Sequence, residues 1–405
     1  MKKPGHSWKP ISPIAWVTRI VSIAATAALV ACSVPMQSFA QESAQLKLHY
    51  GVVPWTGGTN NDALGQAASG ATVPMSTYVQ IATKDGNPYI GVIVGGDPMI
   101  AGPAPVTLHA VVIPLVIQIV GTSVTTFDPT KANSCDGGVS AVTRFKQSPL
   151  VVARSLSFNK VVTGTDQFIN GFMRAQFWAE IGGASTYSNP INWSFASAIT
   201  MQFPAPGLGI VDGSGCNQVG IISQPWLDAQ LQVFIPVWQA AGLISTTKLA
   251  VFLMENVVGS SATPPTTSAC CIGGYHGAVG SPVQTYSPMD YDTSGRFGAT
   301  HDIGIPTHEI GEWMNDPLGN NPTPAWGHIG QTSGCQGNFE VGDPLSGTNM
   351  PAITMSGYVY HPQELAFFSW FFNNKTTASV GTGGKFSAHG TFKGPSQPCP
   401  PGGTF

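Results

Sequence analysis

The segment 307–317 concentrates side chains that can bind a metal ion and move a proton. It reads THEIGEWMNDP and contains His308, Glu309, Glu312 and Asp316, although only 9% of the chain is charged. On a helix, residues four apart share a face, so His308 and Glu312 should point the same way with Glu309 beside them. An imidazole and two carboxylates so placed can hold a divalent cation and activate a water molecule. The simpler interpretation is an exposed helix end with solvated charges.

The flanking residues predict where this helix begins and ends. Asp302 is the expected N-cap, and Pro306 is tolerated in the first turn. Asp316 precedes Pro317, and the helix should end there because a residue before proline avoids the helical conformation. Apolar residues occupy a different side of the helix, namely Ile303, Ile310, Trp313 and Met314. The pattern predicts one face that packs in a core and one face that coordinates a metal.

The segment is similar to the His-Glu-x-x-His motif of zinc metallopeptidases, with Glu312 in place of the second histidine. Over residues 250–370 the chain resembles secreted zincin-type metallopeptidases with a degenerate motif. It resembles more closely a group of exported bacterial proteins of undefined function. Their shared pattern is matched here by His308 to Glu312, Asp316-Pro317, Trp326, and Glu340 to Asp343. A weaker similarity is to the phosphate-induced, EXORDIUM-like plant cell-wall family, which implies a non-enzymatic or undefined role.

The zincin resemblance implies a zinc-dependent hydrolase with a peptide or protein substrate. Glu309 is then the general base that deprotonates a zinc-bound water, and His308 and Glu312 are ligands. Glu340 and Asp343 are the best further ligands, since these two acids lie three residues apart beside an expected turn. The carboxylate of Glu312 adds negative charge, which makes the metal a weaker Lewis acid than a second histidine would.

Neighbouring residues provide alternatives for the ligands and for the metal. Candidates for support are Asp316, His301 and Tyr358, and the spare histidines that could replace a ligand are His276, His328 and His361. Calcium is the alternative cofactor, because it prefers oxygen ligands in flexible loops. The oxygen donors here are Asp316, Asn320, Asn321, Glu340 and Asp343. In that interpretation the chain is a non-catalytic, metal-stabilised extracellular binding or cell-wall module.

Residues 1–40 have the pattern of an export signal. Basic residues precede an apolar run over 20–30, and Ser38-Phe39-Ala40 offers the small residues that signal peptidase requires. The alternative is a lipoprotein signal to residue 31, with Cys32 as the lipid anchor. Both predict an extracytoplasmic protein, either secreted, periplasmic or lipid-anchored. No later stretch predicts a membrane span, and a net charge of -3 gives no basic stripe for nucleic acid.

The other six cysteines predict disulfides, because an even number of cysteines in an exported chain usually pairs. The adjacent Cys270 and Cys271 are expected to bond to two different partners. The connectivity of the remaining cysteines and the oligomeric state stay open at this point.

The segment pattern predicts an α+β fold. Residues 41–145 form a β-rich region, with strands expected over 46–53, 77–83, 89–94 and 106–120. Residues 146–375 form an α/β, zincin-like region that contains the active-site helix. Its expected elements are helices over 148–181 and 228–241 and strands over 193–203 and 248–254. Residues 376–405 are an irregular tail rich in glycine and proline.

Overall fold

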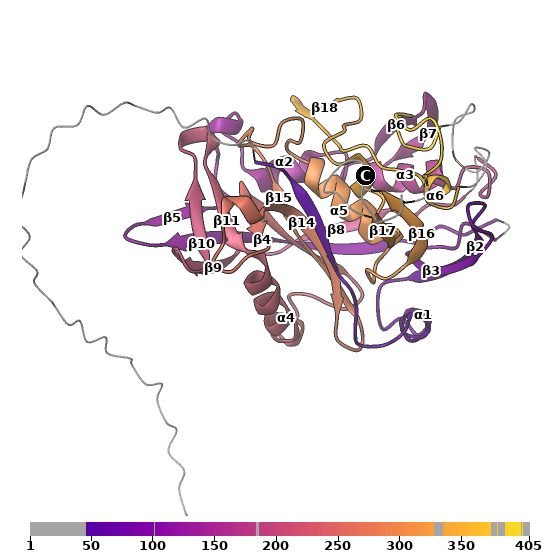
Figure 1. Cartoon of the computed structure of the whole chain (residues 1–405), viewed down its shortest axis with the longest axis horizontal. Helices are drawn as coiled ribbons and strands as arrows, with labels where there is room; N and C mark the ends of the chain where they lie inside the picture. Colours follow the sequence, from indigo (N-terminus) through magenta and orange to yellow (C-terminus); the bar gives the residue numbers. More distant parts are fainter. Residues whose placement is uncertain are drawn as a thin grey trace, which may run out of the picture. The chain divides into compact units, whose positions relative to one another are not determined.

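The computed structural model describes residues 46–100, 102–183, 186–327, 335–373, 379, 385–397 and 399. The export signal, Cys32 and His328 therefore lie outside the described residues. The described chain mixes helices with a larger share of strands, which confirms the α+β class (Figure 1). Among its helices, none is long and apolar enough to cross a membrane.

An 11-stranded sheet forms the centre of the fold, with the order β10-β11-β13-β14-β15-β12-β4-β5, and β1, β8 and β9 pair beside this path. The strands are β1 His49–Val53, β4 Leu108–Val120, β5 Val124–Phe127, β8 Ile191–Phe195, β9 Ile199–Pro204, β10 Gly209–Asp212, β11 Val219–Ser223, β12 Leu249–Glu255, β13 Val257–Ser260, β14 Cys270–Val279 and β15 Gln284–Tyr291. The sheet is mixed, because β12 is parallel to β4 and β15 while β14 is antiparallel to β15. Strands from the β-rich region and from the later region pair in this one sheet.

The remaining elements surround this sheet. Four two-stranded sheets are formed by β2 Met75–Ile81 with β3 Pro88–Val94, β6 Arg154–Phe158 with β7 Val161–Asp166, β16 Pro322–Gly327 with β17 Cys335–Asn338, and β18 Ile353–Met355 with β19 Tyr358–Tyr360. The α-helices are α1 Asn60–Ala68, α2 Ala141–Gln147, α3 Phe168–Gln176, α4 Gln224–Ala240, α5 Gly304–Asn315 and α6 Phe368–Phe371. A short 3-10 helix, η4, covers Asp343–Leu345.

Strand β12 is buried on both faces, as expected for a continuous apolar strand between parallel neighbours. Its side chains alternate between two cores, with Leu249, Val251 and Leu253 on one face and Ala250, Phe252 and Met254 on the other. The first core contains the apolar residues of α5, and the second contains those of α4. The two helices therefore cover opposite faces of the sheet (Figure 1).

Six strands were predicted from the sequence, whereas the described residues form 19. The four strands expected in the β-rich region correspond to β1, β2, β3 and β4, and the expected strand and helix over 228–254 correspond to α4 and β12. The continuous helices expected over 148–181 are wrong in part, because the β6–β7 hairpin occupies 154–166 and only α3 is helical beyond it. The strand expected over 193–203 is divided into β8 and β9, which pair with successive parts of β4.

All six cysteines of the described chain are paired: Cys135–Cys216, Cys270–Cys271 and Cys335–Cys399. The expectation that Cys270 and Cys271 would have different partners is wrong. The fold brings the other four cysteines into two pairs, and the adjacent cysteines lie together in an apolar cluster at the start of β14. Each is thus left with its neighbour as partner.

Helix α5 begins one residue later than an N-cap at Asp302 would place it. Its N-cap is Ile303, with no side-chain hydrogen bond, so the assignment of Asp302 as N-cap is wrong. Asp302 has a positive φ of 40°, and its carboxylate accepts a hydrogen bond from the Nδ1 of His361 at 2.7 Å. Asp316 is the C-cap, as the Asp-Pro step predicts.

Candidate metal centre

Every residue of α5 is buried, which excludes the exposed helix end as an interpretation. Its apolar side packs on β14 and β15, where the Trp313 indole donates a hydrogen bond to the Thr285 hydroxyl at 3.1 Å. Its polar side meets β14 and the segment that follows β17. Charged side chains are rarely buried unless they are paired or bind a metal. The burial of His308, Glu309 and Glu312 therefore requires either neutral side chains or a cation that compensates the carboxylates.

His308, Glu312 and Asp343 form the first potential ligand group, which we call the His308 triad. The His308 Nε2 lies 3.0 Å from the Glu312 Oε1 and 3.5 Å from the Asp343 Oδ1. These separations match the spacing between two ligand atoms that each lie about 2.0–2.1 Å from one zinc ion. The three side chains could therefore hold a metal ion together.

His276, Glu309 and Glu312 form a second group, the His276 triad. The Nδ1 of His276, on β14, lies 3.8 Å from the Glu309 Oε2 and 3.7 Å from the Glu312 Oε2. Glu312 thus belongs to both triads and offers a different carboxylate oxygen to each. The structure brings a histidine from a distant strand beside two carboxylates of α5.

Glu340 lies at the edge of the two triads. Its Oε2 is 3.8 Å from the Nε2 of His276, and its Oε1 accepts a hydrogen bond from the Asn338 amide at 2.7 Å. Asp343 is oriented by a comparable contact, since its Oδ2 accepts from the Gln336 amide at 2.7 Å. Neutral amides therefore hold these two acids without supplying a compensating charge.

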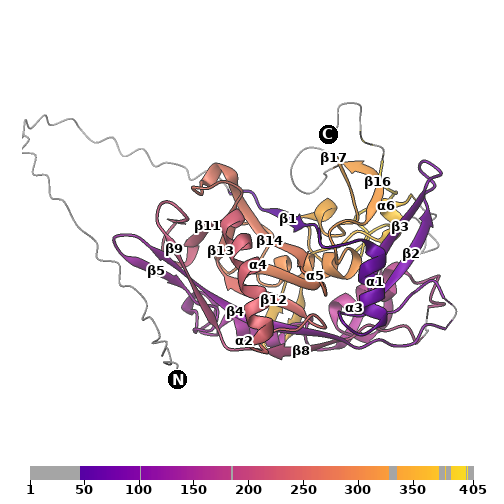
Figure 2. The same cartoon turned by 90° about the horizontal axis from the view of Figure 1, so that it is seen from below.

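The two histidines are oriented by their outer nitrogens. The His276 Nε2 donates a hydrogen bond to the Asp316 carbonyl at 2.9 Å, which leaves Nδ1 as the nitrogen with a lone pair toward the carboxylates. The His308 Nδ1 lies 3.0 Å from the Gln363 amide nitrogen, and the ring stacks on Tyr50 with centroids 3.4 Å apart. Such outer contacts are typical of histidines that bind metals. Tyr50 lies on β1, which Figure 2 shows beside β14.

Two glycines permit the close packing of the site. A Cβ atom at Gly342 would lie 2.4 Å from the His308 Nδ1, and one at Gly274 would lie 2.7 Å from the Glu309 Oε1. Neither distance is tolerated between non-bonded heavy atoms. The main chain at these two positions therefore forms part of the wall around His308 and Glu309.

Burial determines the protonation of the group. It lowers the pKa of His276 to about 3 and that of His308 to about 4, so both imidazoles are neutral at pH 7, as a metal ligand must be. Burial also raises the pKa of Glu312 to about 8 and, together with the Glu312 carboxylate, raises the pKa of Glu309 well above its usual range. The pKa of Glu340 is likewise raised by burial and by Glu312. A bound cation would reverse these upward shifts.

The supporting residues expected from the sequence divide into two sets. Asp316 contributes its carbonyl to His276, and its carboxylate accepts hydrogen bonds from the amides of Asn320 and Asn321. His301, Tyr358 and His361 lie elsewhere: the two histidine rings contact each other, and Tyr358 lies under the Arg144 guanidinium. The Asn321 Oδ1 accepts a hydrogen bond from the Val92 amide, and its Nδ2 donates to the carbonyls of Val92 and Asn315, so this side chain is not placed as a calcium ligand.

Sequence reasoning named His276 only as a spare histidine, although it faces the centre of the site. Its position depends on the pairing of β14 with β15 and on the packing of α5 against both strands. No spacing along the chain links residue 276 with residue 308. The only local signal is that His276 alternates with Tyr275 on a strand and so faces the opposite side of the sheet.

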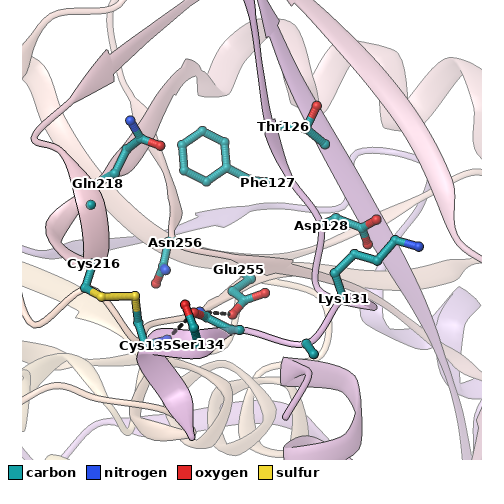
Figure 3. A pocket seen from close by; sticks show the side chains of 13 residues that line it. Thr126, Phe127, Asp128, Lys131, Ser134, Cys135, Cys216, Gln218, Glu255 and Asn256 are labelled. Carbon is teal, nitrogen blue, oxygen red and sulfur yellow. Dashed lines mark hydrogen bonds between the residues drawn. A yellow bond between two sulfur atoms is a disulfide. The ribbon is translucent and has the colours of Figure 1, made fainter. Parts of the chain in front are cut away.

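A separate pocket of about 470 Å³ lies outside this centre (Figure 3). The Cys135–Cys216 disulfide and Phe127 contribute to its wall, and the Asn133 amide donates a hydrogen bond to the Glu255 Oε1 at 2.6 Å. Burial raises the pKa of Glu255 to about 7. Neither Glu340 nor any of the five side chains of the two triads lines this pocket.

The candidate metal centre thus consists of a buried set of two imidazoles and four carboxylates, contributed by β14, α5 and the segment 340–343. Such a set could hold a divalent ion. Comparison with known proteins found no match to the chain among protein-family models, curated proteins or solved structures.

Proposed function

We propose that the protein is an exported, zinc-dependent hydrolase that cleaves peptide bonds. The observation that carries the proposal is the position of Glu309. Both of its carboxylate oxygens are buried and have no hydrogen-bond partner within the described chain, and it lies beside the atoms that could hold a metal. A buried carboxylate with unused oxygens next to a metal is suited to accept a proton from water.

Zinc fits the donor set better than calcium. Calcium takes six to eight oxygen ligands, whereas the centre offers two imidazole nitrogens oriented by outer hydrogen bonds. Zinc binds imidazole and carboxylate together. A bound zinc ion would polarise a water molecule and the scissile carbonyl. Glu309 would take the proton of that water, while His308, Glu312 and Asp343 would hold the ion.

The peptide substrate and the location outside the cytoplasm are supported by the motif in α5 and by the disulfides. The resemblance of α5 to the zincin motif favours a peptide bond as the target. Three disulfides favour an oxidising compartment, which agrees with the export signal expected over residues 1–40.

A second candidate function is favoured by the burial of the ligands. His276, His308 and Glu309 are 0% exposed, and structural zinc sites are closed whereas catalytic ones keep an open position. A metal with a purely structural role would make the chain a metal-stabilised extracellular module. The two functions differ in what they require of Glu309.

The test begins with the metal content of the full chain, purified from an oxidising compartment without added metal. Mass spectrometry should find zinc in the wild type and none in a His308→Ala, Glu312→Ala double variant. Glu309→Gln should then abolish cleavage of a peptide library while the protein stays folded and retains zinc at the His308 triad. A folded wild-type protein without zinc, or with calcium instead, would contradict the proposal. Zinc without any peptide cleavage would favour the structural module.

A further inference from the structure

We infer that the centre holds two divalent ions bridged by Glu312, one in the His308 triad and one in the His276 triad. The inference rests on the proposed function for the first ion and adds a second one. It depends on three observations: the arrangement of the donor atoms around Glu312, the charge of the cluster, and the donor atoms that a single ion would leave unused.

Glu312 has the geometry of a bridging carboxylate. Its Oε1 faces the His308 Nε2 at 3.0 Å, and its Oε2 faces the His276 Nδ1 at 3.7 Å. The two histidines approach from different elements, α5 and β14. Each triad also has an acid of its own, Asp343 in the first and Glu309 in the second. A carboxylate with one imidazole at each oxygen is suited to two ions about 3.5–4 Å apart, the separation typical of two-metal sites.

The charge of the cluster also favours two ions. Glu309, Glu312, Glu340 and Asp343 carry four negative charges when ionised, and the two histidines that face them are neutral ligands. In the part of the chain that is described, no lysine or arginine forms an ion pair with any of the three glutamates. One divalent ion would compensate two of the three glutamate charges and leave the third carboxylate uncompensated. Two divalent ions would compensate all three, and buried charges persist only when they are compensated.

A single ion in the His308 triad would leave the Nδ1 of His276 without a metal ion or a hydrogen-bond partner in the described chain. The His276 ring is fully buried, its Nε2 is fixed by the Asp316 carbonyl, and its Nδ1 has no hydrogen-bond partner in the described chain. This nitrogen is aimed at Glu309 and Glu312. A second ion would use it together with the Glu309 Oε2. The Glu309 Oε1 would remain to accept a proton, so the roles of ligand and base can be divided between its two oxygens.

The inference is tested by the stoichiometry of metal binding to the full-length protein after removal of its metal with a chelator. Titration with Zn²⁺, followed by mass spectrometry of the desalted protein, should give two ions per chain. His276→Ala should reduce this number to one, and the His308→Ala, Glu312→Ala double variant should lose both. His361→Ala serves as the matched histidine control, because His361 pairs with Asp302 outside both triads and should leave two ions bound.

A second measurement on the wild type avoids any risk that the variants misfold. The metal-free protein is loaded with Mn²⁺ and examined by electron paramagnetic resonance. Two ions that share Glu312 should give the exchange-coupled spectrum of a manganese pair. One ion per chain with an uncoupled spectrum would overturn the two-ion inference and leave the proposed function in place. The absence of any bound metal would overturn both.

Discussion

Helices α4 and α5 cover opposite faces of one sheet, yet they differ in how many and which kinds of residue they bury. In α4 the buried residues are Leu227, Leu231 and Ile235, while Val233 and Val237 are 63% and 57% exposed. Its one charged residue, Asp228, accepts hydrogen bonds from Tyr286 and Gln232. In α5 all residues are buried and three of them are ionisable.

The difference distinguishes a helix that serves the fold from one that serves a site. Helix α4 has an N-cap side chain, Ser223, and an apolar stripe that faces the core, although Pro236 lies in its interior. Helix α5 has no side-chain cap and places ionisable groups in the interior. Natural proteins tend to depart from the rules of local stability at functional sites. The following experiments test whether the departure in α5 is explained by a metal.

Removal of the metal should have the largest effect. The chelator EDTA should lower the stability of the wild-type protein, because the buried carboxylates then lose a cation that binds only the folded state. The loss is on the order of 4 kcal/mol at a free metal concentration about 1,000-fold above Kd. Thermal unfolding with and without EDTA measures it. The His308→Ala, Glu312→Ala double variant should show no such difference, and equal Tm values for the metal-loaded and metal-free wild type would refute the charge argument.

Leu231→Ala should lower the stability of the fold and leave the metal content unchanged. Leu231 is fully buried in the core beneath α4, so its truncation should cost about 3 kcal/mol of stability. The metal content should stay at the wild-type value because both triads lie on the other face of the sheet. Denaturant unfolding and metal analysis of the same sample provide the two readouts. Loss of metal from the folded variant would show that the two faces are coupled.

Gly342→Ala should weaken metal binding with a smaller effect on the fold. The added Cβ would lie 2.4 Å from the His308 Nδ1 and would displace that ring. A loss of about 10–100-fold in affinity is expected for disturbed outer contacts of a ligand. Competition with a chromophoric chelator measures the affinity.

Gly311→Ala is the matched control for that substitution. Its added Cβ would meet the flexible end of Leu365 at 2.7 Å, on the apolar side of α5. The affinity for metal should therefore stay within a few-fold of the wild-type value, and equal losses in the two variants would indicate general disruption of α5.

The His361–Asp302 pair should give the smallest effect, through pH. The hydrogen bond to Asp302 raises the pKa of His361 above 6.5, so its contribution to stability is complete below pH 6.5 and is lost as the pH rises through the folded-state pKa. His361→Gln should flatten that part of the pH dependence by less than about 1 kcal/mol, since the pair is partly exposed. Unfolding free energies at pH 5.5 and pH 8.5 measure it. If the unfolding free energies of the wild type and of His361→Gln changed equally with pH, the pair would not contribute to the pH dependence of stability.

Local patterns in the sequence predicted the elements that local rules govern. Alternation and β-branched residues located β1 to β4 and β12, and the Asp316-Pro317 step located the end of α5. Helix α1 was missed because its apolar pattern is weak. The signal that could have found it is the Thr59–Asp62 capping box, in which each side chain accepts a hydrogen bond from the other residue's backbone amide.

The site was less accessible to sequence reasoning, since tertiary packing assembles it. The spacing of His308, Glu309 and Glu312 placed them together on one helix, as the structure does. Neither His276 nor Gln363 could be found this way, because strand pairing and the return of the chain after β17 bring them to the site. The vicinal Cys270–Cys271 bond was missed for a related reason, namely that disulfide partners depend on the whole fold.

The stacking of Tyr50 on His308 has a consequence for the order of folding. Strand β1 pairs in parallel with β14, more than 200 positions later in the chain, and the Tyr50 hydroxyl bonds to Gln363 across 313 positions. Contacts of such long range form slowly, because the intervening chain must be ordered first. During synthesis, the contacts of β1 with β14 and with Gln363 can therefore form only after nearly all of these residues have been added to the chain. A metal ion bound by the His308 triad would be enclosed beneath Tyr50 only at that late stage, so it would stabilise a nearly complete fold rather than start its formation.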